Sequence, residues 1–236
     1  PFLFTEHFQS LDDYTHRAYY ATFIRCLKYI SFFFTILIPG IYVAVASFHP
    51  ELFPEALLFN IAASEESTPF PIVVEALIIH LIFEIMREAG LRLPRPVGHA
   101  VSIVGAIVIG DAAVTAGLIG APMVMVVALT AISSFVVPSL YEPVSILRIV
   151  FILLGGTFGI YGITLALALV FLNLASVNVY GIPVTSPAAP FRIFEWRDAF
   201  IRVNWRRLGR ENLRVQHLPG SELDEADESP NEGGNR

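Results

Sequence analysis

The chain has 236 residues, of which 55% are apolar and only 15% are charged, with a mean hydropathy of +0.64 and a formal net charge of −6. In soluble domains about a quarter of all residues are charged, so this composition argues against a water-soluble globular protein. The single cysteine, Cys26, excludes an internal disulfide and a cysteine-based metal cluster.

Two long stretches of the chain lack charged residues altogether. Thirty residues separate Asp111 from Glu142, and forty-three separate Arg148 from Arg192, without a charged side chain among them. Because an ionised group is costly inside hydrocarbon, long uncharged stretches are typical of segments that lie in a bilayer. We therefore predict an all-α integral membrane protein, a multi-pass bundle of about four to six membrane helices of about 20 residues each, one of them amphipathic with a polar face.

The expected membrane domain covers residues 29–190. Residues 1–28 are more polar and read as a juxtamembrane segment, the end of a preceding cytoplasmic domain. Residues 29–48 are uncharged and long enough for a first span, in which Pro39 and Gly40 are expected to form a kink and a possible hinge. Basic residues precede this span and four glutamates follow it in residues 49–71, so the positive-inside rule predicts that it runs from the cytoplasm to the exterior.

Residues 72–86 are apolar but interrupted by ionisable side chains, and a basic stretch follows them. At 100° per residue, one arc of a helix carries His80, Glu84, Arg87 and Glu88, and Glu75 lies on the far side. Such a helix either crosses the membrane with its polar arc turned to protein or water, or lies along the membrane surface.

Two further apolar segments are separated by a very short turn. Residues 97–119 form a predicted span that contains Asp111, and residues 123–137 follow after Gly120-Ala121-Pro122, so we expect a helical hairpin. Residues 149–177 would extend roughly 44 Å as a straight helix, against a hydrocarbon core of about 30 Å. Glycines within this last segment predict a broken helix, a tilted helix or a re-entrant turn, with possible hinges at Gly155, Gly156 and Gly159.

The last part of the chain divides into a basic and an acidic segment. Residues 191–215 are rich in arginine with interleaved tryptophans, which favours contact with anionic lipid at the cytoplasmic face over contact with nucleic acid. Residues 216–236 are acidic and read as a disordered tail. Five spans would place the basic segment outside, against the positive-inside rule, so we favour a chain that turns back within residues 149–177.

Ionisable residues inside membrane segments are the candidate functional residues. Carboxylates lining a water-filled path attract cations, and a histidine there can sense pH. The alternatives are that Glu84 and Glu88 only pair with Arg87, and that the Asp111 carboxyl only holds helices together. The residues predicted to act in a pore or in gating are Glu75, His80, Glu84, Glu88, Asp111 and Thr115.

Several stretches together resemble the A subunit of bacterial spore germinant receptors. The most specific is FEIMREAGLRLP at residues 83–94; others are PFLFTEHFQSLDDY at 1–14, IPGIYVA at 38–44 and YGIP at 180–183. The similarity covers roughly residues 1–210. Position 111 is often a neutral amide in that family, so Asp111 is a departure from its pattern.

The resemblance implies a non-enzymatic receptor subunit without cofactors, in the inner membrane of the spore. It further implies a homo-oligomer that forms a nutrient-gated path for monovalent cations, together with a transporter-like B subunit and a lipoprotein C subunit. No metal-ligand, phosphate-loop or nucleophile motif appears in the sequence. Two alternatives stay open: a secondary transporter that binds a small solute, and a non-conducting membrane scaffold for receptor partners.

Overall fold

The computed structural model describes residues 3–94, 105, 108–179, 182–186 and 199–201. The described part is mostly helical, and its first long helix is α2, Ala18–Phe48. Residues 29–48, predicted as the first span, lie within α2, but the helix begins earlier, at Ala18. No glycine or proline interrupts residues 18–38, so nothing in the local sequence stops the helix at the polar boundary. Pro39 lies inside the helix.

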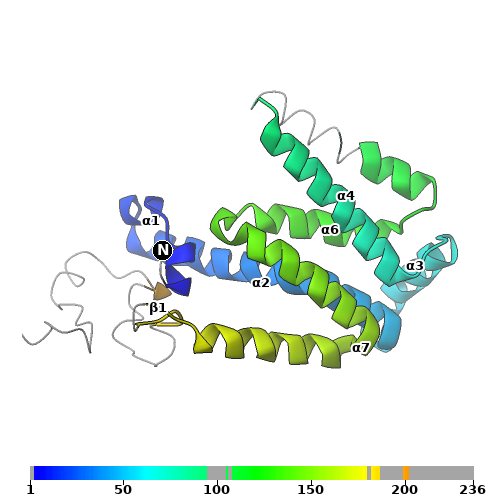
Figure 1. The fold of residues 1–236 in the computed structure, drawn as a ribbon. Coiled ribbons are helices and arrows are strands. Elements are labelled where there is room, and N and C mark those ends of the chain that lie inside the picture. The colour runs from blue at the N-terminus through cyan, green and yellow to red at the C-terminus, as the bar shows by residue number, and fades with distance from the viewer. Residues whose placement is uncertain (1–2, 95–104, 106–107, 180–181, 187–198, 202–236) are drawn as a thin grey trace, which may run out of the picture.

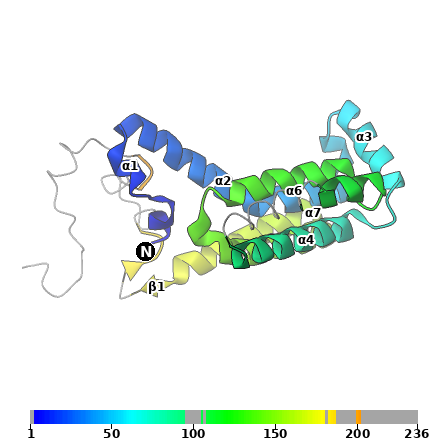
Figure 2. The ribbon, with the colours of Figure 1, turned by 90° about the horizontal axis from the view of Figure 1, so that it is seen from above.

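The glutamate-rich segment after α2 is also helical. It forms a 3-10 turn, η2 (Pro50–Leu52), and the short helix α3 (Glu55–Glu66). In Figure 2, α3 lies at the end of the helical body opposite to α1 (Asp12–Thr15). This end of the molecule is called the acidic end below, after Glu51, Glu55, Glu65 and Glu66.

The polar-faced helix predicted from residue 72 onward is α4, Ile72–Arg92. Residues 108–115 are helical, and the chain then turns into α6, Ala121–Ser134, with Gly120 as its N-cap. The turn contains Gly117 at a φ of 66°, a conformation that glycine adopts without strain. The side chain of Val124 lies within ordinary contact distance of a methyl group built on Gly110, so the predicted hairpin is confirmed in its described part.

The most consequential element is α7, Tyr141–Ser176, which follows the 3-10 turn η3 (Pro138–Leu140). It is bent at Gly159, whose φ of 62° and ψ of −149° are not helical. A methyl group on Gly162 would lie 2.6 Å from the carbonyl oxygen of Leu154, because the chain doubles back on itself there. Figure 1 shows the two arms of α7 running out and back. The predicted break, and the turning back that we favoured, are confirmed.

The residues that lie beside α7 show where its bend and its second end are. At Gly159 a methyl group would contact the ring of Phe48, the last residue of α2, so the bend lies at the acidic end. The chain after α7 forms a short hairpin of β1 (Asn178–Val179) and β2 (Ile182–Pro183), with Val179 opposite Ile182. Beyond it, the carbonyl of Val184 accepts a hydrogen bond from the Phe4 amide at 2.9 Å. The second arm therefore ends beside the start of the described chain.

The segment that precedes α2 packs over this same end. It contains the 3-10 turn η1 (Phe4–Phe8) and α1. Phe8 is fully buried, and Tyr29 stacks both on Phe8 and on Phe200, with ring centroids 4.0 and 4.6 Å apart. We call this the basic end, because Arg17, Arg25 and Lys28 lie here at the start of α2.

Two apolar clusters hold the helices together. One joins α2 to α7 and includes Ile36, Ala44 and Phe151; the other joins α2, α4 and α6 and includes Val43, Ile79 and Met123. Helices α2 and α7 approach most closely where Gly40 meets the backbone of Phe151 and Gly155 meets the carbonyl of Gly40. A side chain at either glycine would separate the two helices.

Two helices of the described part are long and apolar enough to cross a membrane: α2, and the segment Pro138–Ser176 that contains α7. This supports the membrane class predicted from the sequence, but the described part does not settle a count of four to six crossings. The basic segment at 191–215, apart from residues 199–201, lies outside the described residues. The tail at 216–236 and most of the first half of the span at 97–119 do so as well.

Candidate functional site

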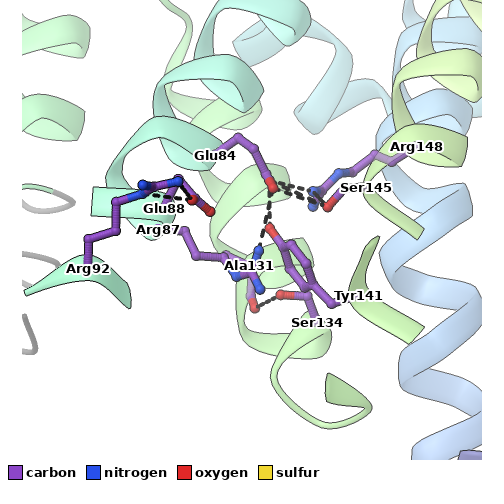
Figure 3. A network of polar contacts seen from close by, with 9 residues as sticks. All are labelled: Glu84, Arg87, Glu88, Arg92, Ala131, Ser134, Tyr141, Ser145 and Arg148. Carbon is purple, nitrogen blue, oxygen red and sulfur yellow. Dashed lines mark hydrogen bonds and ion pairs between the residues drawn. The ribbon is translucent and has the colours of Figure 1, made fainter. Parts of the chain in front are cut away.

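The polar face of α4 meets the first arm of α7 in a cluster of side chains (Figure 3). Glu84 is its centre and accepts a hydrogen bond from the Tyr141 hydroxyl at 2.5 Å. The Glu84 carboxylate also lies 3.4 Å from Ser145 Oγ, 3.4 Å from Arg148 Nη2 and 3.5 Å from Arg87 Nη1. We call Glu84, Arg87, Tyr141, Ser145 and Arg148 the α4–α7 cluster.

The two charges at the heart of this cluster differ in their exposure. The side chain of Arg148 is 2% exposed, and that of Glu84 is 35% exposed. Arg148 Nη2 donates to Ser145 Oγ at 3.3 Å, whereas its Nε and Nη1 are buried without a hydrogen-bond partner among the described residues. A buried donor without an acceptor costs about 1–3 kcal/mol. The cluster therefore combines a carboxylate that water reaches with a buried cation that is incompletely satisfied.

Arg87 completes the cluster on its exposed side. Its guanidinium lies over the ring of Tyr141 and pairs with Glu84 one turn earlier on α4. The sequence-based alternative that Glu84 only pairs with Arg87 is thus incomplete, because Glu84 also contacts three residues of α7.

His80 lies one turn before Glu84 and is 3% exposed. Its Nδ1 donates to the Ala76 carbonyl at 2.8 Å, which leaves Nε2 as an acceptor in the neutral ring. Nε2 is buried and has no partner among the described residues. The structure thus places His80 inside the protein, on the side of α4 predicted for it.

Glu75 lies at the other end of α4, near the acidic end, and is 2% exposed. Its carboxylate accepts a hydrogen bond at 3.2 Å from the amide of Gly120, the N-cap of α6. A negative charge at a helix N-terminus is favourable, so Glu75 stabilises the turn into α6. It does not contact the α4–α7 cluster.

The other three predicted residues lie apart from that cluster. Glu88 pairs with Arg92 at 2.7 Å on the surface, with both side chains more than half exposed. Asp111 and Thr115 are exposed on the helix of residues 108–115, and Asp111 forms no hydrogen bond or ion pair within the described part of the chain. Of the six predicted pore or gating residues, only His80 and Glu84 lie where α4 meets α7.

Three residues of the α4–α7 cluster were not predicted from the sequence. Tyr141, Ser145 and Arg148 lie at positions i, i+4 and i+7, which places them on one face of a helix. That spacing was the available signal. Charge patterning alone makes Arg148 the boundary of an uncharged segment, whereas α7 begins earlier, at Tyr141.

A second ion cluster lies at the basic end, outside the apolar parts of the helices. Asp13 accepts from Arg25 Nε at 3.0 Å, from Lys28 Nζ at 3.3 Å, and from the amide and hydroxyl of Ser10. Burial alone would raise the pKa of Asp13, but the hydrogen bond from Arg25 and the other donors hold it below its ordinary value. We call Ser10, Asp13, Arg25 and Lys28 the N-terminal ion cluster.

The predicted hinge residues have two different environments. Gly159 forms the bend of α7. Gly40, Gly155 and Gly156 instead lie at close helix crossings, where a methyl group would collide with Phe151, Gly40 and Val73 respectively. Pro39 is buried inside α2. Their role as hinges stays a prediction.

The chemistry available to this site is that of charge and hydrogen bonding. Within the described residues, no group of three or more histidine, cysteine, aspartate or glutamate side chains is placed to hold a metal ion. The described part thus combines two helices of membrane-spanning length, α2 and α7, with a carboxylate–arginine cluster between α4 and α7, and this combination suggests a membrane protein.

The chain is similar over residues 1–212 to the family described as Bacillus/Clostridium GerA spore germination protein. It belongs to that family, and the resemblance found in the sequence is confirmed. No solved structure matches it.

Among curated relatives, spore germination protein KA of Bacillus subtilis (strain 168) is 48% identical over 207 residues, which cover 87% of this chain and 38% of that protein. The uncharacterized membrane protein YfkQ of the same organism is 42% identical, over 89% of this chain and 41% of that protein. Spore germination protein GerLA of Bacillus cereus is 40% identical, over 86% of this chain and 42% of that protein. The chain thus spans about two fifths of the length of these relatives.

Proposed function

We propose that this chain is the membrane region of an A subunit of a nutrient germinant receptor, acting in spore germination. In this proposal it assembles with like chains into a ligand-gated path for monovalent cations in the inner membrane of the spore. A transporter-like B subunit binds the nutrient, and a lipoprotein C subunit completes the receptor. Membership of the GerA family and the membrane-length helices support the setting. The name of the relative YfkQ, a membrane protein, agrees with it.

The observation that carries the gating part of the proposal is the α4–α7 cluster. Glu84 is partly exposed and therefore reachable by water and ions, whereas its partner Arg148 is buried. While the pair is closed, the positive charge of Arg148 offsets the carboxylate that would attract a cation. A shift of α7 against α4 would release Glu84 from Tyr141, Ser145 and Arg148 together. Nutrient binding on a partner would shift the equilibrium between these two arrangements.

The distribution of charge supports an orientation across the membrane. The start of α2 at the basic end carries Arg17, Arg25 and Lys28, and the acidic end carries four glutamates of residues 50–66. The positive-inside rule assigns the basic end to the cytoplasmic side. The bend of α7 at Gly159 and the hydrogen bond between Phe4 and Val184 support a chain that leaves the proposed membrane region on the side where α2 enters it. A straight last span would instead place the basic segment 191–215 outside, against the positive-inside rule.

The proposal is tested by nutrient-triggered release of potassium from spores that carry the full-length protein. Removing the protein should abolish release to its nutrient, and restoring it should recover release. Glu84→Gln keeps the shape of the side chain and removes its charge, so it should change the initial rate of release by about tenfold, which corresponds to a change of about 1.4 kcal/mol in a barrier. Asp111→Asn is predicted to change the rate as well.

The matched control is Glu88→Gln on the same helix. Among the described residues Glu88 pairs only with exposed Arg92, so its loss should leave the rate of release within about twofold of the wild type. Normal release from both Glu84→Gln and Asp111→Asn spores, at normal protein levels, would remove these residues from the ion path. Receptor assembly without any conductance in reconstituted vesicles would favour the scaffold over the channel.

A further inference from the structure

A cavity of about 730 Å³ lies between the two arms of α7 and α2. Its walls are almost entirely apolar, formed by Phe32, Ile36, Val144, Leu147, Leu167 and Val170 among others. Its volume is within the range of about 300–1,000 Å³ typical of small-molecule sites. No residue of the α4–α7 cluster lines it.

We call this cavity the wedge, after the angle between the two arms of α7. Phe151 and Leu167, each eight residues from the bend at Gly159, line its end near the bend. The two arms separate from the bend toward the basic end, as Figure 1 shows, and we call the opposite end of the cavity its wide end. Leu140 and Leu174 line the wide end. From Phe151 to Leu140 the first arm rises by about 16 Å, close to the thickness of one leaflet of a hydrocarbon core of about 30 Å.

The few polar groups of the wedge gather at its wide end. His7 and Asn173 line it there, and the Nδ1 atom of His7 is buried without a hydrogen-bond partner among the described residues. Burial lowers the pKa of His7, so its ring is neutral near pH 7 and offers one donor and one acceptor. Lys28, one turn before Phe32 on α2, lies on the same side of that helix beyond the wide end.

The wedge opens onto the apolar outer surface of α7. Ile146 and Leu169 line it and are themselves 67% and 58% exposed. In a bilayer, such a surface is in contact with lipid tails, so the space of the wedge is continuous with hydrocarbon.

We propose that the wedge between the arms of α7 holds one acyl chain of a bilayer phospholipid, with the ester and headgroup region of the lipid beside His7 and Asn173. This inference rests on the membrane setting of the proposed function but not on ion conduction. The chain enters from the wide end, where the polar groups lie, and its tail points to the bend at Gly159. The bound lipid fills the open space that remains between the two arms of α7 and α2.

Native mass spectrometry of the protein tests this, after purification in detergent with phosphatidylglycerol as the added lipid. We expect one phospholipid adduct that survives the activation that strips loosely bound lipid. Leu147→Trp fills the wedge and should lower the retained adduct about tenfold, equivalent to about 1.4 kcal/mol of binding free energy. Leu153→Trp, on an exposed position of the same arm, is the matched control and should keep it.

A second variant tests the contact with the lipid headgroup separately from the contact with the acyl chain. His7→Leu preserves apolar volume but removes the ring nitrogens, and it should lower retention with less effect than Leu147→Trp. The proposal is overturned if the wild type retains no adduct, or if Leu147→Trp and Leu153→Trp retain it equally. It is also overturned if photocrosslinkers placed at Leu147 in receptor-containing membranes capture protein and not lipid. Normal potassium release without a retained lipid would refute this inference and leave the proposed function intact.

Discussion

The N-terminal ion cluster and the α4–α7 cluster both pair a carboxylate with a buried arginine, yet they are built differently. Asp13 is 3% exposed at its side chain and accepts from four donor atoms. All members of its cluster lie within residues 10–28. Glu84 is 35% exposed, and its partners on α7 are 57 to 64 residues away in the sequence.

In the proposed function, this difference separates a structural role from a switching role. A buried ion pair within one short segment, whose carboxylate accepts from several donors, costs much to break and can hold the segment in one place. An ion pair that joins two helices and whose carboxylate is open to water loses less on opening, because water can replace the partner of the carboxylate. We therefore assign the N-terminal ion cluster to the fixed frame and the α4–α7 cluster to the moving part.

The largest predicted effect is the loss of the Asp13 carboxylate. Asp13→Ala leaves Arg25 and Lys28 without their shared counter-charge, and it should lower the free energy of unfolding by about 3–5 kcal/mol. For a chain of this size that is roughly 6–20 °C in the midpoint of thermal unfolding, followed by circular dichroism in detergent. The neighbouring exposed Asp12 provides the control, since Asp12→Ala should change the midpoint by less than about 2 °C.

The same residue predicts a pH dependence. Because the folded-state pKa of Asp13 is lowered, its contribution to stability is complete above the ordinary carboxyl pKa of about 3.9 and is lost as the pH falls through the lower folded-state value. The difference in unfolding midpoint between the wild type and Asp13→Asn should therefore be constant from pH 5 to 8 and should shrink below about pH 4. A difference that grows on acidification would contradict the assignment.

The two ion clusters lie on helices that pack against each other, because Arg25 lies on α2 and Arg148 on α7. Gly40 lies at the place where these two helices cross. A methyl group on Gly40 would lie 2.8 Å from the carbonyl oxygen of Phe151, so Gly40→Ala should cost about 1–3 kcal/mol. Gly110→Ala, whose methyl group has its nearest neighbour at 3.8 Å, should be neutral or slightly stabilising. Equal effects of the two substitutions on the unfolding midpoint would show that α7 is not held against α2 in this way.

The smallest predicted effect is at the arginine of the α4–α7 cluster. Arg148→Met removes a buried cation with two unpaired nitrogen atoms, while Glu84 keeps Tyr141, Ser145 and Arg87 as partners. The free energy of unfolding should change by no more than about 1 kcal/mol. A loss as large as that of Asp13→Ala would place both clusters in the fixed frame and end the comparison.

Much of the fold followed from the sequence, because charge-free length and glycine position are local signals. The bend of α7 was anticipated from Gly155, Gly156 and Gly159, and the backbone shows that Gly159 carries it. The predicted first span, 29–48, lies within α2, which extends back to Ala18. The sequence pattern does not reveal that Asp13 pairs with the buried Arg25 in this extension. The helix α3 was not anticipated either.

The candidate site was only half predictable. Helical spacing placed His80 and Glu84 on one face of α4, and that face does meet protein. The same spacing grouped Glu88 with them, although it lies with Arg92 at the surface. The place of Tyr141, Ser145 and Arg148 in the site depends on which helices pack together. The pattern of hydrophobic residues alone does not determine that packing.

The most direct test is the side of the membrane reached by three single cysteines. In a Cys26→Ser background, cysteines replace exposed Thr15, Ser67 and Ser176, one in each variant, and an impermeant maleimide is applied to sealed vesicles. Our account predicts that Thr15→Cys and Ser176→Cys react from the same side and Ser67→Cys from the opposite side. Reaction of Ser176→Cys together with Ser67→Cys would mean that α7 crosses without turning back, and it would contradict the account.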